Sequence, residues 1–218
     1  MSEWIGVNVG SGRHVTDGWL SLDHSKHVLA ARVPGLAATL NRIGLMKDTQ
    51  MPYRRNGDWR RVRFWDATMA IPLPDASVQY AYSSHVLEHF SPERALVVVR
   101  DVLRVLKPGG RFRVVLPDLE QVGRAYLALQ TSDTVEFRDR RITREEWSDQ
   151  ASEFCFHGAG ELFGHHVMYD KLGARRLLLR GGFSAVDDCE FRKGSVPNLD
   201  SLDLPERAVE SLYVEGVK

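Results

Sequence analysis

Two glycines and an aspartate near the start of the chain have the residue types of a nucleotide-binding loop. In NVGSGRHVTDGWLSLD, Gly10 and Gly12 supply the first two glycines of a G-x-G-x-x-G pattern, but Val15 stands at the third position. Asp23 follows soon afterwards, whereas a dinucleotide site expects its acidic residue about 20 residues further on, beyond a full helix. Because a pyrophosphate binds at the N-terminus of that helix, the short spacing disfavours NAD and favours a ligand without phosphate.

The segment HVLEH, residues 85–89, is a second group that could do chemistry. It matches H-x-x-E-H, an inverted zinc-peptidase signature, and on a helix His85 and His89 would share one face and could bind zinc. Against zinc, the motif directly follows an apolar run typical of a strand, a new helix is expected at Ser91, and no third ligand is evident. We therefore expect no metal ion, and two roles remain open for Glu88 and the histidines: bracing the end of the strand, or acid–base catalysis.

The elements that must position these residues alternate between strands and helices. Short apolar runs predict strands at 4–9, 19–23, 62–66, 78–84, 111–118, 185–191 and 211–217. Apolar residues at helical spacing predict helices at 35–45, 119–129 and 170–183. The clearest helix has Ser91 as its N-cap and Pro92 at its first position, and KPGG at 107–110 is expected to stop it. This alternation predicts an α/β fold with a mainly parallel sheet and helices on both faces.

In such a sheet, ligands bind beyond the carboxyl ends of the strands. Gly10, Ser11 and Gly12 follow the first strand and would let the backbone approach a ligand closely. Asp23 follows the second strand and could accept hydrogen bonds from both hydroxyls of a ribose. Asp66 follows the third strand and could accept from an adenine amino group. Each could instead be a plain turn or cap residue, but their register at successive strand ends favours one shared ligand.

Composition limits the class of protein. The 218 residues suit one domain, and 43% hydrophobic with 27% charged residues are ordinary for a soluble globular protein. Lys+Arg and Asp+Glu balance at 29 each, so we expect neither a nucleic-acid nor a membrane-surface partner. Two cysteines, Cys155 and Cys189, form no disulfide framework, and no signal peptide or long apolar run is evident. A cytoplasmic protein is the expectation.

The chain resembles the class I S-adenosylmethionine-dependent methyltransferases and is most similar to the methyltransferase type 11 group. Besides the glycine loop and Asp23, the resemblance rests on WDAT at 65–68, PLPDASVQYAYSSHVLEHF at 72–90, VLRVLKPGGRFRVVLPD at 102–118, HHVMYD at 165–170 and SLYVEGVK at 211–218. It implies one Rossmann-like domain over residues 1–218, with a seven-stranded sheet whose last strand is antiparallel. The segments at about 26–60 and 130–160 fall outside the resemblance, and insertions are expected at about 26–60 and 130–166.

The resemblance also implies S-adenosyl-L-methionine as the cofactor. Gly10 and Gly12 would pass beneath its methionine part, Asp23 would hold the ribose, Asp66 would hold the adenine, and Ser83 would line the methionine end. The remaining expected cofactor-binding residues are Asn8, Ser11 and Ala67.

Transfer of a methyl group from a sulfonium is an in-line displacement, so approach and alignment supply much of the rate. His85 is expected nearest the methyl donor and is the first candidate for the base that takes the acceptor's proton, with Glu88 and His89 behind it. The expected acceptor-binding residues are Asp118, His165, His166 and Tyr169. Cys155 with His157 would make a poor metal pair without two further ligands.

The sequence therefore predicts a methyltransferase that acts on a small-molecule or glycan-type acceptor, the glycan being suggested by the resemblance alone. A non-catalytic module that binds S-adenosylmethionine is the alternative, because the glycine loop is short. A zinc hydrolase built on HVLEH is the remote alternative.

Overall fold

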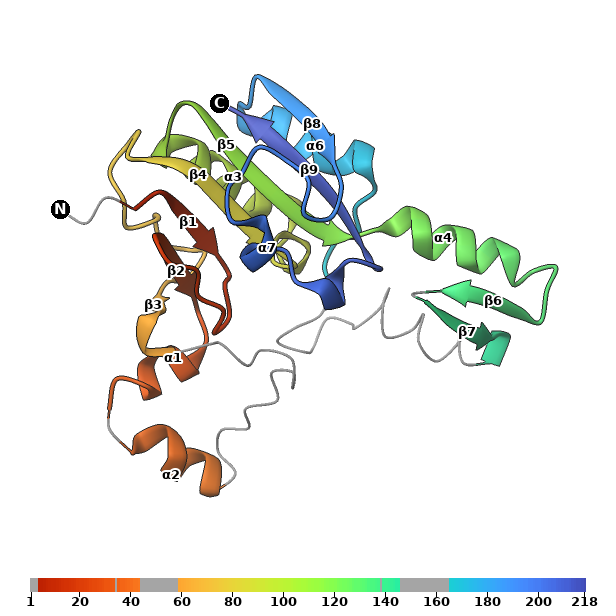
Figure 1. Cartoon of the computed structure of the whole chain (residues 1–218), viewed down its shortest axis with the longest axis horizontal. Helices are drawn as coiled ribbons and strands as arrows, with labels where there is room; N and C mark the ends of the chain where they lie inside the picture. The colour runs from red at the N-terminus through yellow and green to blue at the C-terminus, as the bar shows by residue number, and fades with distance from the viewer. Residues whose placement is uncertain (1–3, 34, 44–58, 138, 146–164) are drawn as a thin grey trace.

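The structure, a computed structural model, describes residues 4–33, 35–43, 59–137, 139–145 and 165–218. Its centre is a seven-stranded sheet in the order β3-β2-β1-β4-β5-β9-β8 (Figure 1). The strands are β1 (Gly6–Val9), β2 (Trp19–Asp23), β3 (Arg63–Phe64), β4 (Val78–Ser84), β5 (Leu106–Pro117), β8 (Ala185–Cys189) and β9 (Ser211–Val217). All pairs from β3 to β5 are parallel, and β9 runs antiparallel to both β5 and β8. The predicted mainly parallel sheet with an antiparallel last strand is confirmed.

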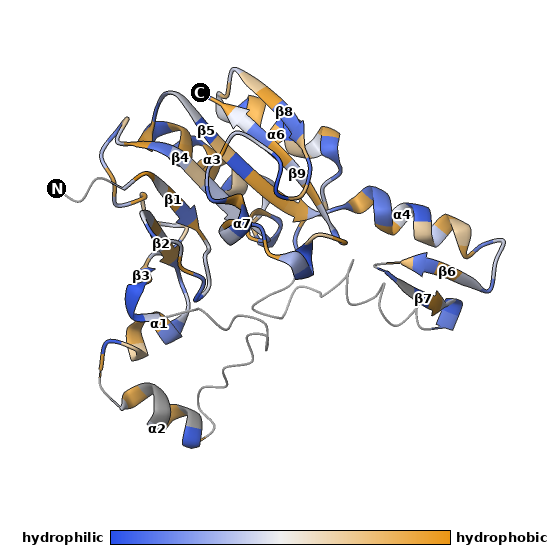
Figure 2. Ribbon diagram, in the orientation of Figure 1, coloured by the Kyte–Doolittle hydropathy of each residue, from blue (hydrophilic) through white to orange (hydrophobic). Residues whose placement is uncertain are grey.

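Both faces of the sheet are covered, because its central strands alternate apolar side chains to either side. Figure 2 shows hydrophobic residues along β4, β5 and β9. On one face, the main core joins the sheet to α3 (Pro92–Val105) and α6 (Lys171–Gly181). On the other face, Trp19, Tyr82 and Tyr213 pack against a segment at 196–202 that contains α7 (Leu199–Leu202). No helix of the described residues is long and apolar enough to cross a membrane.

Helix α3 begins where the sequence predicts and ends slightly earlier. The Ser91 hydroxyl accepts a hydrogen bond from the Arg94 amide at 3.3 Å, and Pro92 occupies the first turn. The helix ends at Val105, because Leu106 is already extended and pairs with Val78 of β4. Lys107–Gly110 therefore lie within β5. The sequence had suggested that they stop the helix, and this expectation is wrong. The burial of Leu106 in the sheet decides this boundary.

The connection between β1 and β2 contains no helix, which confirms the short loop. The connection between β8 and β9 lies against this loop. His14 Nε2 lies 2.5 Å from the Ser201 carbonyl oxygen, and the hydroxyls of Thr16 and Ser201 lie 3.0 Å apart. Trp19 Nε1 donates to Asn198 Oδ1 at 3.1 Å. The connection between β8 and β9 thus packs against the short loop and the start of β2.

Each expected insertion contains some regular structure. The first has α1 (Lys26–Ala30), α2 (Leu36–Arg42) and the 3-10 turn η1 (Trp59–Arg61). In the second, a hairpin of β6 (Thr134–Phe137) and β7 (Arg140–Thr143) follows α4 (Leu119–Ala128). Helix α4 and the hairpin extend away from the sheet (Figure 1) and share a small core of their own. The hairpin was not predicted, because four-residue strands leave too little alternation to detect. Cys155 and His157 lie outside the described residues.

Candidate active site

The glycine turn after β1 is required by the backbone itself. Gly10 and Gly12 have φ of +72° and +56°, and the amides of Gly10 and Ser11 both donate to the Leu22 carbonyl at 2.8 and 2.9 Å. A Cβ on Gly10 would lie 2.2 Å from a methyl carbon of Val86. The turn therefore packs tightly between β2 and the loop after β4. Position 10 requires glycine for this packing, independently of any ligand.

Asp23 ends β2 and holds this turn in place. Its carboxylate accepts from the Gly12 amide at 2.7 Å and, through the other oxygen, from the Ser25 amide at 2.8 Å. The side chain is 8% exposed. Because each carboxylate oxygen can accept two hydrogen bonds, these contacts leave acceptor capacity for the hydroxyls of a ligand.

Asp66 follows β3 and forms a turn; the alternative interpretation, an N-cap, is wrong because the described residues directly after it form no helix. Its Oδ1 accepts from the amide and the hydroxyl of Thr68, at 2.8 and 2.6 Å. These hydrogen bonds lower the pKa of the Asp66 carboxyl. The neighbouring Trp65 amide donates to the Asp23 carbonyl at 3.0 Å, which joins the ends of β3 and β2. Ala67 comes next, and its carbonyl accepts from Arg94 at 3.4 Å.

The ends of β1 and β4 carry buried polar groups. Asn8 is 3% exposed and lies between Ser21 and Tyr82 in the parallel register. Ser83 is 1% exposed, and within the described residues its hydroxyl has no hydrogen-bond partner. A buried polar group without a partner is costly, so the Ser83 hydroxyl stands out at the strand end where the methionine side of the cofactor is expected.

His85 has a left-handed backbone, with φ of +54°. Few residues other than glycine adopt this conformation, and strain of this kind clusters at functional sites. The imidazole is largely buried: Nε2 lies 2.8 Å from the Ser211 hydroxyl, and Nδ1 lies 3.3 Å from an Arg207 guanidinium nitrogen. His85 thus faces the last strand, and these contacts favour the bracing role over the role of a free base.

Glu88 lies behind His85 and is fully buried. Neither carboxylate oxygen has a hydrogen-bond partner among the described residues; Oε1 lies 3.6 Å from His85 Nδ1 and 3.9 Å from His89 Nε2. Burial raises the pKa of the Glu88 carboxyl to about 8. A group that titrates near neutral pH is suited to acid–base work or to binding a cation.

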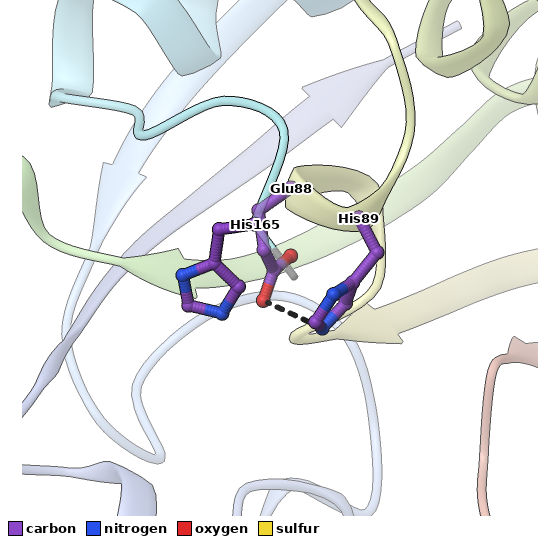
Figure 3. A group of neighbouring side chains, drawn as sticks. All are labelled: Glu88, His89 and His165. Atoms are coloured by element: carbon purple, nitrogen blue, oxygen red, sulfur yellow. Dashed lines mark ion pairs between the residues drawn. The ribbon is translucent and has the colours of Figure 1, made fainter. Parts of the chain in front are cut away.

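The four expected acceptor-binding residues have different surroundings. His165 lies beside His89, with ring centroids 4.9 Å apart, and both face Glu88 (Figure 3). Tyr169 is buried, and burial, together with the charge of Glu88, raises its pKa. Asp118 caps α4 by accepting from the Glu120 amide at 3.0 Å, and the side chain of His166 is exposed. Of the four residues, His165 and Tyr169 therefore lie near Glu88, whereas Asp118 caps a helix and His166 is exposed.

Two residues at this site were not predicted. Arg207 and Ser211 contact His85 across more than 100 positions of sequence. Arg207 lies outside the motifs quoted above, and Ser211 begins SLYVEGVK, but nothing in that motif indicates a contact with His85.

The arrangement expected of a zinc peptidase is not formed by HVLEH. Leu87–His89 make a single 3-10 turn, η2, and no α-helix places His85 and His89 on one face. The His85 ring turns toward Ser211, whereas His89 turns toward His165.

Comparison with known proteins agrees with this fold. The model of a methyltransferase domain family, Methyltransf_11, matches residues 35–114. A possible exported protein from Bordetella parapertussis has a similar structure, with a TM-score of 0.51 at 12% identity over 99% of this chain and 62% of that one. The S-adenosylmethionine-dependent methyltransferase SibL, in its apo form, gives a TM-score of 0.51 at 18% identity over 98% of this chain and 50% of that one.

This chain thus spans less than two thirds of the length of either protein. Among curated protein sequences there is no match. The family match and the seven-stranded sheet together support a class I S-adenosylmethionine-dependent methyltransferase domain, with a Rossmann-like fold.

Proposed function

We propose that the protein transfers a methyl group from S-adenosylmethionine to a small molecule or a glycan-type hydroxyl. The observation that carries the proposal is the alignment of the glycine turn, Asp23, Asp66 and Ser83 at the carboxyl ends of β1, β2, β3 and β4. Chain order reverses between β1 and β4, and ligands of open α/β sheets bind at such a switch point.

The residues present suit this cofactor, which supplies a methyl group on a cationic sulfur and carries no phosphate. The absence of a helix between Gly12 and Asp23 removes an anion site that this ligand does not need. Asp23 accepts the ribose hydroxyls, and Asp66 offers its second oxygen to the adenine amino group. The Gly10–Gly12 backbone and the Ser83 hydroxyl face the methionine portion, with Asn8, Ser11 and Ala67 around them.

In the transfer itself, the acceptor oxygen forms a bond to the methyl carbon as the carbon–sulfur bond breaks. S-adenosylhomocysteine leaves, and the acceptor's proton must be removed. His85 was the first candidate for that base, but its ring contacts Ser211 and Arg207. We assign it to positioning, and proton removal falls to the group around Glu88, where His165 and Tyr169 would meet the acceptor.

Calorimetric titration with S-adenosylmethionine and S-adenosylhomocysteine tests the cofactor assignment. Loss of hydrogen bonds to a charged acceptor costs about 1.5–3 kcal/mol, so we expect Asp23→Ala to weaken binding by roughly 10- to 100-fold. Asp17→Ala is the matched control, because Asp17 lies in the same connection with its side chain 92% exposed. Absence of binding by the wild-type protein to both compounds would refute the proposal.

A second experiment separates the enzyme from a non-catalytic binding module. The protein is incubated with S-adenosylmethionine and a set of small hydroxyl compounds and oligosaccharides, and S-adenosylhomocysteine is measured by mass spectrometry. Acceptor-dependent release supports the transferase. Tight cofactor binding without release for any acceptor would favour the binding module.

A further inference from the structure

Two segments far apart in the sequence bring three metal-ligating side chains together. Glu88 and His89 belong to the turn η2, and His165 precedes α6. One ligand atom from each of the three lies within 4.8 Å of the others, and Figure 3 shows the two imidazoles on either side of the carboxylate.

The carboxylate at the centre of this cluster needs a partner. Glu88 is fully buried, and neither of its oxygens has a hydrogen-bond partner among the described residues. Buried carboxylates are normally paired, hydrogen-bonded or bound to a metal. A cation placed between Glu88 and the two imidazoles would supply what the described protein groups do not.

We propose that Glu88, His89 and His165 bind one divalent transition-metal ion, with Zn²⁺ the first to test. Two imidazole nitrogens and one carboxylate oxygen form a ligand set that suits Zn²⁺ and related ions. Ligand atoms about 2.0–2.2 Å from a shared tetrahedral ion lie about 3.3–3.6 Å apart. The three atoms here lie within 4.8 Å of one another, so side-chain rotations that shorten the longest separation by about 1 Å would complete the site.

Backbone hydrogen bonds hold the two segments of the cluster together, which would help their side chains to bind one metal ion. The Glu88 carbonyl accepts from the amides of His166 and Val167, at 2.8 and 3.2 Å, which ties the segment carrying His165 to η2. On the other side, His85 Nδ1 lies 3.6 Å from Glu88 Oε1. Groups that touch a ligand in this way orient it for the metal. The sequence led us to expect no metal because HVLEH follows a strand, a helix starts at Ser91 and no third ligand was evident. In the structure, His165 from a distant segment lies beside His89 and Glu88 in place of His85.

A metal ion at this site would take part in the proposed methyl transfer, and this catalytic role rests on the proposed function. Three protein ligands leave at least one coordination position for an acceptor hydroxyl, whose pKa a bound Zn²⁺ lowers. With a metal ion bound, Glu88 would serve as a ligand and no longer as part of the base. The hydroxyl proton would then pass to solvent, and the oxygen would attack the methyl carbon as the carbon–sulfur bond breaks.

Metal binding is measured directly, without cofactor or acceptor. The full chain is stripped with a chelator and titrated with Zn²⁺ in competition with a chromophoric chelator. We expect one ion per chain. Loss of a residue that only orients a ligand costs 10- to 100-fold in metal affinity, so we expect His165→Ala, which removes a ligand, to weaken binding by at least about 100-fold.

His166→Ala is the matched control, because His166 is the adjacent histidine with an exposed side chain. Glu88→Gln, which keeps the shape of the side chain, should also lose the ion, and circular dichroism checks that each variant is folded. Binding retained by His166→Ala and lost by the other two supports the site. No stoichiometric binding by the wild type, or equal affinity in His165→Ala, would overturn it.

Cofactor titration of the stripped protein keeps the two proposals apart. Zn²⁺ binding without S-adenosylmethionine binding would refute the function and leave the metal site standing. S-adenosylmethionine binding without Zn²⁺ binding would do the reverse.

Discussion

Two regions of the described structure bury ionisable side chains and treat them in opposite ways. Arg113, fully buried on β5, donates to the Asp203 carboxylate at 3.0 and 2.6 Å and to Glu215 at 3.1 Å. It also donates to the carbonyls of Glu190 and Lys193, at 2.8 and 3.1 Å. Glu88 is equally buried, yet neither of its oxygens has a hydrogen-bond partner in the described part of the chain.

The difference separates structure from function. The Arg113 group joins β5, β9 and the connection that covers the short loop, so every partner stabilises the fold. A fully satisfied network of this kind is rigid. The group around Glu88 keeps a carboxyl whose pKa burial raises to about 8, which costs stability near neutral pH and suits the proton removal proposed for it. Substitutions in the two regions should therefore affect different properties.

Breaking the Arg113 group should have the largest effect on stability. Asp203→Asn deprives the buried Arg113 guanidinium of one of its two charged partners, so we expect the free energy of unfolding to fall by about 3–5 kcal/mol. Asp187→Asn is the control: Asp187 pairs with Arg111 on the same strand but is 56% exposed, and its loss should cost less than about 1 kcal/mol. Urea unfolding measures both. Equal losses would mean that burial does not distinguish the pairs.

Gly10→Ala should also destabilise, through the loop that carries Glu88. The positive φ costs about 1–2 kcal/mol and the contact with Val86 adds about 1–3 kcal/mol. Gly109→Ala is the matched control, since Gly109 has φ of +71° and no atom within 4 Å of the added carbon. Thermal unfolding compares the two. Equal destabilisation by Gly109→Ala would show that the close approach to Val86 carries no cost. If that approach does carry a cost, Gly10→Ala should be less destabilising in a protein that also carries Val86→Ala.

Glu88→Gln should raise the free energy of unfolding at pH 7 by about 1–3 kcal/mol. Burial keeps this carboxyl protonated in the folded protein, whereas the unfolded chain ionises it, and Gln is neutral in both states. Urea unfolding of the metal-free protein measures this. A loss as large as that of Asp203→Asn would show that Glu88 also serves the fold.

The smallest effect concerns Cys189, which reports on the Arg113 region without disturbing it. Burial first, and then the charge of Glu215, raise the pKa of this thiol to about 11. The thiolate is the reactive form, and at pH 8 only about one Cys189 thiol in a thousand is ionised. The alkylation rate should therefore be low and rise about tenfold per pH unit up to about pH 11. Alkylation with iodoacetamide, followed by peptide mass spectrometry, gives the rate at Cys189. A midpoint near 8.5 would indicate an ordinary exposed thiol.

A raised pKa of this kind also sets the sign of a stability change. The folded protein holds the Cys189 proton more tightly than the unfolded chain does. Its contribution is therefore complete below the unfolded pKa and is lost as the pH rises through about 11.

Much of the fold could be predicted because it depends on local patterns. The bounds of β2, β4 and β9 follow from apolar alternation, and Ser91-Pro92 starts α3 through a hydrogen bond within one turn. The end of α3 could not be placed, because Leu106 is drawn into β5 by its pairing with β4.

The candidate site divides in the same way. The sequence by itself determined the residues at the strand ends, Gly10, Gly12, Asp23, Asp66 and Ser83, since each directly follows its own strand. Only the tertiary structure decided that His165, and not His85, joins His89 beside Glu88, and that Arg207 and Ser211 hold His85. The physical reason is that these contacts join side chains from distant segments, whose meeting depends on how the chain packs and leaves no pattern in any one of them.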